Sequence, residues 1–158
     1  MTCTPPRFIA DAMLGRLARW LRFAGYDTVY DTSLDDGELA RLARETGRVL
    51  LTRDRELAGR RGITAYLVSS EQIQEQVAEV LRAFGKTGPV SPPRCAVCNG
   101  LLADAERESV QGKVPPHVWS DQAAFRVCRG CGRVYWGGTH WEGIRRGLEE
   151  ARGTPRDR

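Results

Sequence analysis

Residues 49–54 read Val49-Leu50-Leu51-Thr52-Arg53-Asp54, a short apolar run that stops at an acid. A similar run, Phe8-Ile9-Ala10-Asp11, lies near the start of the chain, and 42 residues separate the two terminal aspartates. In an open parallel sheet the carboxyl ends of the strands face a common crevice, so acids placed there can converge although they are distant in sequence. Converging carboxylates are the ligands that a hard divalent cation binds. The two runs therefore predict a cation site at one edge of a sheet.

The residues around these runs alternate short β-rich segments with helical ones, which is the pattern of βαβ units. We therefore predict an α/β fold in which helices flank a mostly parallel sheet. The strands are predicted at Phe8–Ala10, Thr28–Tyr30, Arg48–Thr52 and Ala65–Val68, and the helices at about 12–23, 37–46, 54–58 and 71–84.

The composition changes at residues 85–93, a stretch of Gly, Pro and Ser that is typical of a linker. We place a first domain at residues 1–87 and a second, loop-rich domain at residues 88–158 with a short helix at about 141–152. The predicted boundary puts the two acid-ended runs in the first domain.

The composition, 41% hydrophobic and 28% charged, is that of a soluble globular protein. No run approaches the roughly 20 apolar residues needed to cross a bilayer, and the first residues lack the apolar core of a signal peptide. We expect a cytoplasmic protein without a membrane partner. The net charge of +4 is consistent with a polyanionic partner.

Asp36 is the expected third acid, because it opens the second predicted helix directly after the second strand. Each of the three acids also fits a simpler reading as a helix cap, which Ser, Thr or Asn would serve equally well. Three carboxylates at successive strand-to-helix turns favour metal binding over helix capping. Oxygen ligands favour Mg²⁺ or Mn²⁺ over zinc, and such an ion suits phosphodiester hydrolysis without a histidine or serine nucleophile.

Four of the five cysteines form two Cys-x-x-Cys pairs, Cys95 with Cys98 and Cys128 with Cys131. Two such pairs predict a structural Zn²⁺ with four thiolate ligands and no open position. The 29 residues between the pairs exceed the commonest spacing, which a longer hairpin can absorb. A redox dithiol and an iron–sulfur cluster are the alternatives.

Basic and aromatic residues lie close to the cysteine pairs, the combination that grips single-stranded RNA through phosphate contacts and base stacking. Alternatively, the aromatic residues form the small hydrophobic core of the zinc-binding domain. We favour this core role over RNA stacking for Tyr135 and Trp136. The residues concerned are Arg94, Arg126, Arg129, Arg133, Trp136, His140 and Trp141.

Two segments carry a family resemblance: the acid-ended run Phe8–Asp11 followed by residues 13–22, Met-Leu-Gly-Arg-Leu-Ala-Arg-Trp-Leu-Arg, and Leu50–Asp54 with its Thr-Arg-Asp ending. Together with Asp36-Gly37-Glu38-Leu39 they resemble the Mut-seven carboxy-terminal ribonuclease domain. The resemblance implies a PIN-like α/β domain followed by a zinc ribbon, and metal-dependent cleavage of RNA with Asp11, Asp36 and Asp54 as catalytic metal ligands. It also implies a further acid, for which Asp31, Asp35 and Glu38 are the candidates.

The helix that follows Asp11 presents Arg16, Arg19 and Arg22 at three-residue spacing, and Arg53 stands beside Asp54. Arginines on an amphipathic helix commonly form only a solvated face. Because this helix leaves the predicted metal site, we expect these four residues to contact substrate phosphates.

The sequence thus predicts a metal-dependent ribonuclease whose zinc ribbon helps to bind RNA. Two alternatives stay open: a non-catalytic RNA-binding adapter in which the acids only cap helices, and a toxin-type PIN nuclease regulated by a partner. The sequence predicts neither the oligomeric state nor the RNA sequence preference.

Overall fold

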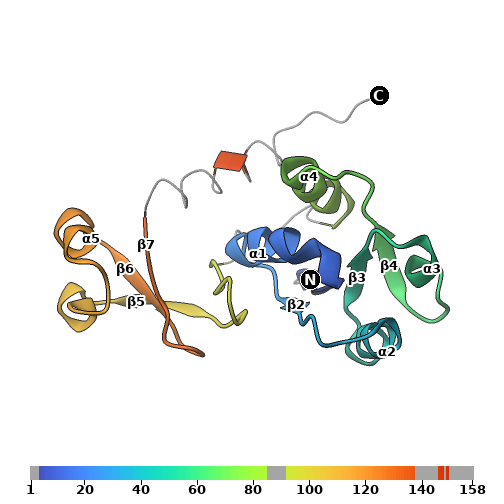
Figure 1. Cartoon of the computed structure of the whole chain (residues 1–158), viewed down its shortest axis with the longest axis horizontal. Coiled ribbons are helices and arrows are strands. Elements are labelled where there is room, and N and C mark those ends of the chain that lie inside the picture. Colours follow the sequence, from blue (N-terminus) through green and yellow to red (C-terminus); the bar gives the residue numbers. More distant parts are fainter. Residues whose placement is uncertain (1–3, 85–91, 138–145, 148, 150–158) are drawn as a thin grey trace.

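The computed structural model describes residues 4–84, 92–137, 146–147 and 149. Residues 4–84, the sheet unit, contain a four-stranded parallel sheet with the order β2-β1-β3-β4 (Figure 1). Ala10, the last residue of β1, lies opposite both Tyr30 of β2 and Leu51 of β3. The strands are β1 (Phe8–Ala10), β2 (Thr28–Tyr30), β3 (Val49–Thr52) and β4 (Thr64–Leu67).

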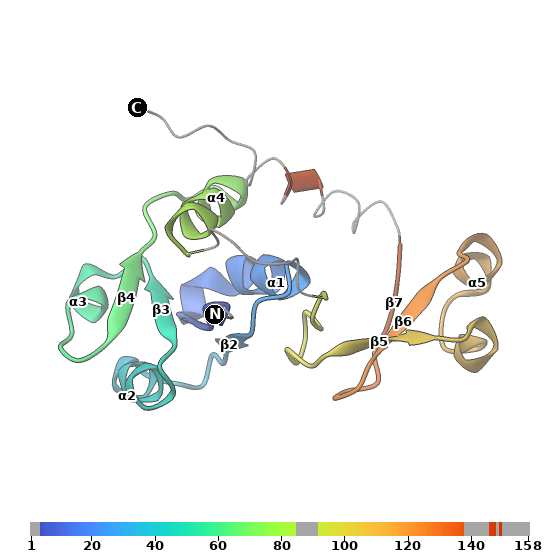
Figure 2. The same cartoon turned by 180° about the vertical axis from the view of Figure 1, so that it is seen from behind.

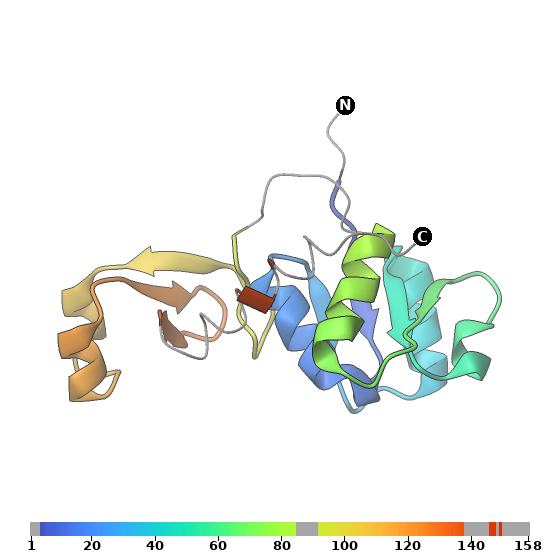
Figure 3. The same ribbon diagram turned by 90° about the horizontal axis from the view of Figure 1, so that it is seen from above.

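Helices cover both faces of this sheet (Figures 1 and 3). Successive strand residues point to opposite faces, so Phe8 and Ala10 pack with α1 and α4 while Ile9 packs with α2 and α3. All of these predicted elements are present, with ends shifted by one or two residues. The helices are η1 (Ala12–Leu14), α1 (Gly15–Phe23), α2 (Asp36–Thr46), α3 (Arg55–Ala58) and α4 (Ile73–Phe84).

The direction in which the chain adds strands to the sheet reverses between β1 and β3. The chain moves from β1 outward to the edge strand β2, then crosses back over β1 to β3 on the other side. Right-handed crossovers in opposite directions place α1 and α2 on opposite faces, which opens a crevice beyond the carboxyl ends of β1 and β3. We call the position where these two strands end the carboxyl edge; Asp11, Thr52 and Asp54 lie there.

Residues 92–137, the cysteine unit, contain an antiparallel sheet with the order β5-β6-β7. The 29 residues between the cysteine pairs are not a plain hairpin, because β5, η2 and α5 lie between the pairs and build a core around Val110, Val114 and Phe125. This correction to the loop-rich prediction reflects a helix of only six residues, too short to show periodicity. The elements are β5 (Leu102–Ala105), η2 (Arg107–Val110), α5 (Pro116–Asp121), β6 (Phe125–Cys128) and β7 (Val134–Trp136).

The cysteine unit lies beside the edge strand β2, and α5 forms its far end (Figures 1 and 2). Most of the helix predicted at 141–152 lies outside the described residues, as does the predicted boundary at 87/88. Arg146, Gly147 and Glu149 are helical. A Cβ on Gly147 would come within 2.6 Å of the Trp20 ring, so the chain returns to α1 after β7. No helix in the described ranges is long and apolar enough to span a bilayer.

Candidate active site and cysteine metal centre

Asp11 is a nearly buried carboxylate directly after β1, with 8% of its surface exposed. It stands before η1, but its side chain makes no capping hydrogen bond. Its Oδ2 instead accepts a 2.9 Å bond from the Thr52 hydroxyl, and its amide bonds to the Leu51 carbonyl, so β3 holds it from the neighbouring strand. The capping alternative is therefore wrong for this acid.

Asp54 does cap a helix. Its Oδ1 accepts bonds from the amides of Glu56 and Leu57, at 2.8 and 3.3 Å. Its own amide donates a 3.0 Å bond to the Thr52 hydroxyl, the same hydroxyl that reaches Asp11. Both cap bonds fall on one oxygen, so the other oxygen of the carboxylate is not used by the cap. Thr52 is fully buried and links the two acids, a role for which the sequence carried no signal beyond its place in the Thr-Arg-Asp segment.

Asp36 is the first residue of α2 and is exposed, while the cap belongs to Asp35. Asp35 and Glu38 form a reciprocal capping box, in which each side chain accepts from the backbone amide of the other. Among the candidates for a further acid, Asp35 and Glu38 thus each use one carboxylate oxygen to hold the helix start. Asp31 follows Tyr30, the register partner of Ala10, and its Oδ1 accepts from the amide and hydroxyl of Ser33.

The three predicted acids all stand at strand-to-helix turns, but they do not gather as tightly as the cysteines. In the described part of the chain, the only group of three or more ligand side chains whose atoms lie within 4.8 Å of one another is the four cysteines. Mg²⁺ keeps several waters and is held by one or two carboxylates, so it does not require three direct contacts. The described residues therefore show a ready-made ligand cluster for the cysteines and not for the three acids.

The turn after Asp11 is held by the neighbouring strand β2. The Tyr30 hydroxyl donates a 2.8 Å bond to the Ala12 carbonyl. A Cβ on Gly15 would lie 2.8 Å from that hydroxyl, so the glycine in the Met-Leu-Gly segment allows the phenol to approach the turn. β2 therefore supports the position of Asp11 as β3 does.

Arg16 and Arg19 are exposed on α1, as predicted, but Arg22 is a correction. Three residues on a helix fall about 60° short of a full turn, so Arg22 is rotated about 120° from Arg16, toward the packed side. Its side chain is buried, and its guanidinium donates to the carbonyls of Thr28 and Ala96 at 2.9 and 2.6 Å. Arg22 thus joins the two units, and its guanidinium is already bonded to these two carbonyls.

Arg53 is half-buried at the carboxyl edge, and its ion pair with the rest of the chain is long. Its terminal nitrogen lies 3.6 Å from the exposed Glu71 carboxylate. Its buried Nε has no hydrogen-bond partner among the described residues. The guanidinium remains able to contact an anion, unlike that of Arg22.

The four paired cysteines converge on one point. The sulfur atoms of Cys95 and Cys131 are 3.7 Å apart, and those of Cys98 and Cys128 are 3.3 Å apart. A tetrahedral zinc with Zn–S bonds of about 2.3 Å requires S···S distances of about 3.8 Å, whereas a disulfide requires about 2.05 Å. All four thiols are free. The residues present therefore fit a tetrahedral metal such as zinc.

The backbone comes close to the sulfur atoms of the paired cysteines. A Cβ on Gly100 would lie 2.9 Å from the Cys128 sulfur and 3.1 Å from that of Cys98. The Tyr135 hydroxyl lies 2.9 Å from the Cys95 sulfur and accepts from the Ala96 amide. Burial raises the pKa of the Cys95 thiol, but Tyr135 and nearby amides outweigh it and lower that pKa to about 6. The thiolate form, which binds metal, is thereby favoured.

The Mut7-C RNAse domain profile matches residues 6–148, which include the carboxyl edge and all four paired cysteines. The chain belongs to this family. No curated protein and no solved structure matches the chain. Membership confirms the family that the sequence resembles, and it indicates a ribonuclease-type function with RNA as substrate.

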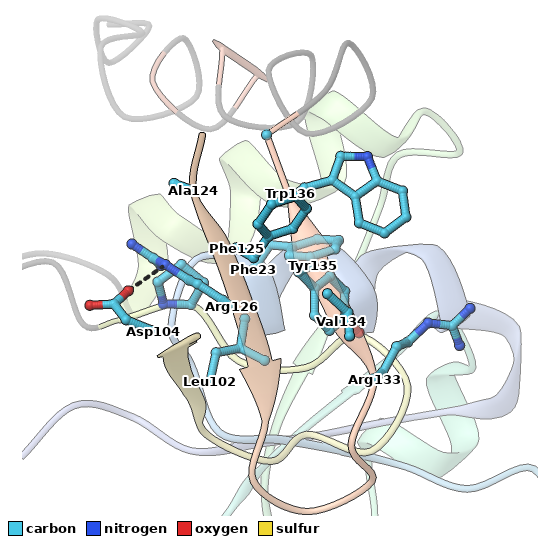
Figure 4. A pocket seen from close by; sticks show the side chains of 12 residues that line it. Phe23, Leu102, Asp104, Ala124, Phe125, Arg126, Arg133, Val134, Tyr135 and Trp136 are labelled. Carbon is cyan, nitrogen blue, oxygen red and sulfur yellow. Dashed lines mark ion pairs between the residues drawn. The ribbon is translucent and has the colours of Figure 1, made fainter. Parts of the chain in front are cut away.

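This Mut7-C chain also has a cavity of about 510 Å³ between the cysteine-unit sheet and the end of α1 (Figure 4). The Phe23 ring meets the Tyr135 ring edge-on at 6.2 Å, and Arg126 and Arg133 lie at the rim. Arg126 is 3.6 Å from the Asp104 carboxylate. Trp136 lines the cavity and also packs against the core around Val110, as the small-core interpretation predicts. Tyr135 lines the cavity too, and its hydroxyl contacts the Cys95 sulfur.

Proposed function

We propose that this Mut7-C protein is a metal-dependent ribonuclease of the PIN-like class. In this proposal Asp11, Asp36 and Asp54 hold a catalytic Mg²⁺ or Mn²⁺, and the four cysteines hold a structural Zn²⁺. The observation that carries the proposal is the state of Asp11, a nearly buried carboxylate at the reversal point of the sheet that performs no capping.

Burying a charged carboxylate costs free energy unless hydrogen bonds or a counter-charge compensate it. Thr52 supplies a single side-chain bond to Asp11. The described structure contains no ion pair between Asp11 and a basic residue. A divalent cation beside Asp11 would supply that counter-charge, which is a reason for the acid to be kept there.

A bound Mg²⁺ or Mn²⁺ would stabilise charge on the scissile phosphate and lower the pKa of an attacking water. The chain's own residues supply position. Thr52 holds the Asp11 carboxylate and the Asp54 backbone through one hydroxyl. The Tyr30 hydroxyl holds the turn that follows Asp11. The hydrogen bond from the Glu56 amide holds Oδ1 of Asp54 at the start of α3. Ligands supported by packed strand ends are held more precisely than ligands on loops.

We place the RNA along α1. That helix starts beside Asp11 and ends at Phe23, next to the cysteine unit. Arg16 and Arg19 are exposed along it, and Arg53 lies at the carboxyl edge. Phosphate contacts from these arginines would hold a single strand across the site without reading its sequence.

The test is cleavage of a labelled single-stranded RNA by the full-length chain in Mn²⁺ and in EDTA. Asp11→Asn and Asp54→Asn are the informative variants, because asparagine can still accept from Thr52 and can still cap α3 while the charge is lost. Glu45→Gln, an exposed acid at the other end of α2, is the matched control. We expect wild type and control to cleave in Mn²⁺ only, and both asparagine variants to lose at least roughly a hundredfold in rate.

A second function, the non-catalytic RNA adapter, is favoured by one observation: Asp54 makes both bonds expected of a plain helix cap. The same assay separates the two functions. RNA binding without cleavage in any divalent ion would reject the nuclease and leave the adapter.

A further inference from the structure

We propose that Asn99 is a positioning residue for the carboxyl edge, through which the first cysteine pair holds the strand β2 in place. This inference rests on the proposed function, because it assigns Asn99 a part in the nuclease reaction. It starts from the first knuckle, residues 95–100, which contacts the sheet unit although about 70 residues separate the two in sequence.

Asn99 follows the metal-site residue Cys98 and has a positive φ of 69°, the only described residue other than glycine that does so. Its amide donates to the Cys95 carbonyl at 2.9 Å, which closes the knuckle. The backbone conformation of Asn99 is thus part of the loop that carries Cys95 and Cys98. From this loop its side chain reaches the start of β2.

The Asn99 side chain makes two bonds to the start of β2. Its Oδ1 accepts from the Thr28 amide at 3.0 Å, and its Nδ2 donates to the Asp27 carboxylate at 2.7 Å. The Thr28 carbonyl in turn accepts from Arg22. Both backbone polar groups of this fully buried edge residue are therefore satisfied from outside the sheet by Asn99 and Arg22. Arg22 is itself tied to the knuckle at Ala96.

β2 has only three residues, and its other side pairs with β1, whose end carries Asp11. Two residues beyond Thr28, the Tyr30 hydroxyl holds the Ala12 carbonyl in the turn after Asp11. A short strand with one paired side has little cohesion of its own. The knuckle thus reaches Asp11 through Asn99, Thr28 and Tyr30, and a small displacement there changes the position of a catalytic ligand.

The test uses Asn99→Gly in the full-length, zinc-loaded chain. Glycine accepts the positive φ, and all four cysteines remain, so zinc per chain should equal that of wild type. We expect amide hydrogen exchange in residues 26–31 to accelerate at least roughly tenfold. We also expect kcat for RNA cleavage in Mn²⁺ to fall roughly tenfold while KM stays within about twofold. Gln111→Ala, an exposed change elsewhere in the cysteine unit, is the control and should alter neither.

A second arm exchanges the two partners. Asn99→Asp opposes the Asp27 carboxylate with another, and Asp27→Asn removes a charge from the Arg48 ion pair, so each single variant should exchange faster. The double variant restores one donor and one acceptor and should recover most of the protection in residues 26–31. Failure of the double variant to recover more than either single one would overturn the pairing.

The outcomes separate this inference from the proposed function. If wild type leaves RNA intact in Mn²⁺, the proposed function fails, and the exchange measurements still decide whether Asn99 holds β2. If wild type cleaves and Asn99→Gly keeps its kcat, the positioning role is rejected and the nuclease stands. Unchanged exchange in Asn99→Gly also rejects it.

Discussion

The hydroxyl of Thr52 donates a 2.9 Å hydrogen bond to Oδ2 of Asp11 and so connects the ends of two adjacent parallel strands. The same hydroxyl accepts from the Asp54 amide at 3.0 Å. Two acids that lie far apart in the chain are therefore oriented by a single oxygen atom.

Thr52→Val should lower kcat roughly tenfold while the chain stays folded. Valine has nearly the shape of threonine but leaves the Asp11 carboxylate and the Asp54 amide without this partner, at a cost of about 1–3 kcal/mol. Thr52→Ser keeps the hydroxyl and should retain most of the activity. Thr64→Val, at an exposed position of β4, controls for the substitution itself. Steady-state cleavage in Mn²⁺ measures the effect, and equal rates for the valine and serine variants would contradict it.

Removing both charges from α1, in Arg16→Gln with Arg19→Gln, should weaken RNA binding and raise KM with little change in kcat. Each lost phosphate contact lowers the slope of log K against log salt by about 0.7 for a single strand. The salt dependence of affinity for a labelled RNA gives this slope. Arg41→Gln, on the exposed side of α2, should leave it unchanged. A double variant with the wild-type slope would place the RNA elsewhere.

Arg22→Met should destabilise the fold by about 2–3 kcal/mol, because the buried Thr28 carbonyl and the partly buried Ala96 carbonyl both lose a charged donor. Its effect on RNA affinity should be small compared with that of Arg16 and Arg19. Urea unfolding followed by circular dichroism measures the change. Arg19→Met, an exposed position on the same helix, should stay within about 0.5 kcal/mol of wild type. Similar unfolding midpoints for the two variants would argue against the assigned role of Arg22.

Cys98→Ser should reduce zinc from one ion per chain and unfold the cysteine unit, because a four-thiolate site loses a ligand. Elemental analysis with protease sensitivity in residues 92–137 reports both effects. Cys3→Ser is the matched control, since Cys3 belongs to neither pair. Full zinc occupancy in Cys98→Ser would show that the four cysteines do not share one ion.

Glu79 contributes stability that depends on pH. Burial raises the pKa of its carboxyl, but bonds from Ser69 and Ser70 outweigh burial and hold that pKa below its ordinary value of 4.5. The ionised form is therefore favoured in the folded state, and its contribution is complete above pH 4.5 and declines as the pH falls below it. The free energy of unfolding of wild type minus that of Glu79→Gln should accordingly shrink from pH 7 to pH 4. A difference that grows on acidification would contradict the sign.

Local sequence patterns predicted much of this fold because they report local physics. The apolar runs at Phe8–Ala10 and Val49–Leu51 form strands whose side chains are buried on both faces of the sheet. A continuous apolar run is the pattern expected of a strand in a parallel sheet that helices cover on both faces. Asp35 and Gly47 mark the start and end of α2 through a capping box and a left-handed residue, and both signals are local. Helix α5 was missed because six residues form less than two turns and show no periodicity.

The sequence by itself determined the elements, the acid-ended strands, the paired cysteines and the family, since each depends on residue types at short spacing. Only the tertiary structure decided the strand order β2-β1-β3-β4, and with it that Asp11 and Thr52 meet at the reversal point. It also decided that Arg22 is buried while Arg16 and Arg19 are exposed, because burial depends on what packs against each face of the helix. Asn99 and Thr28 are 71 residues apart, and no local pattern encodes a contact that forms only when two units pack together.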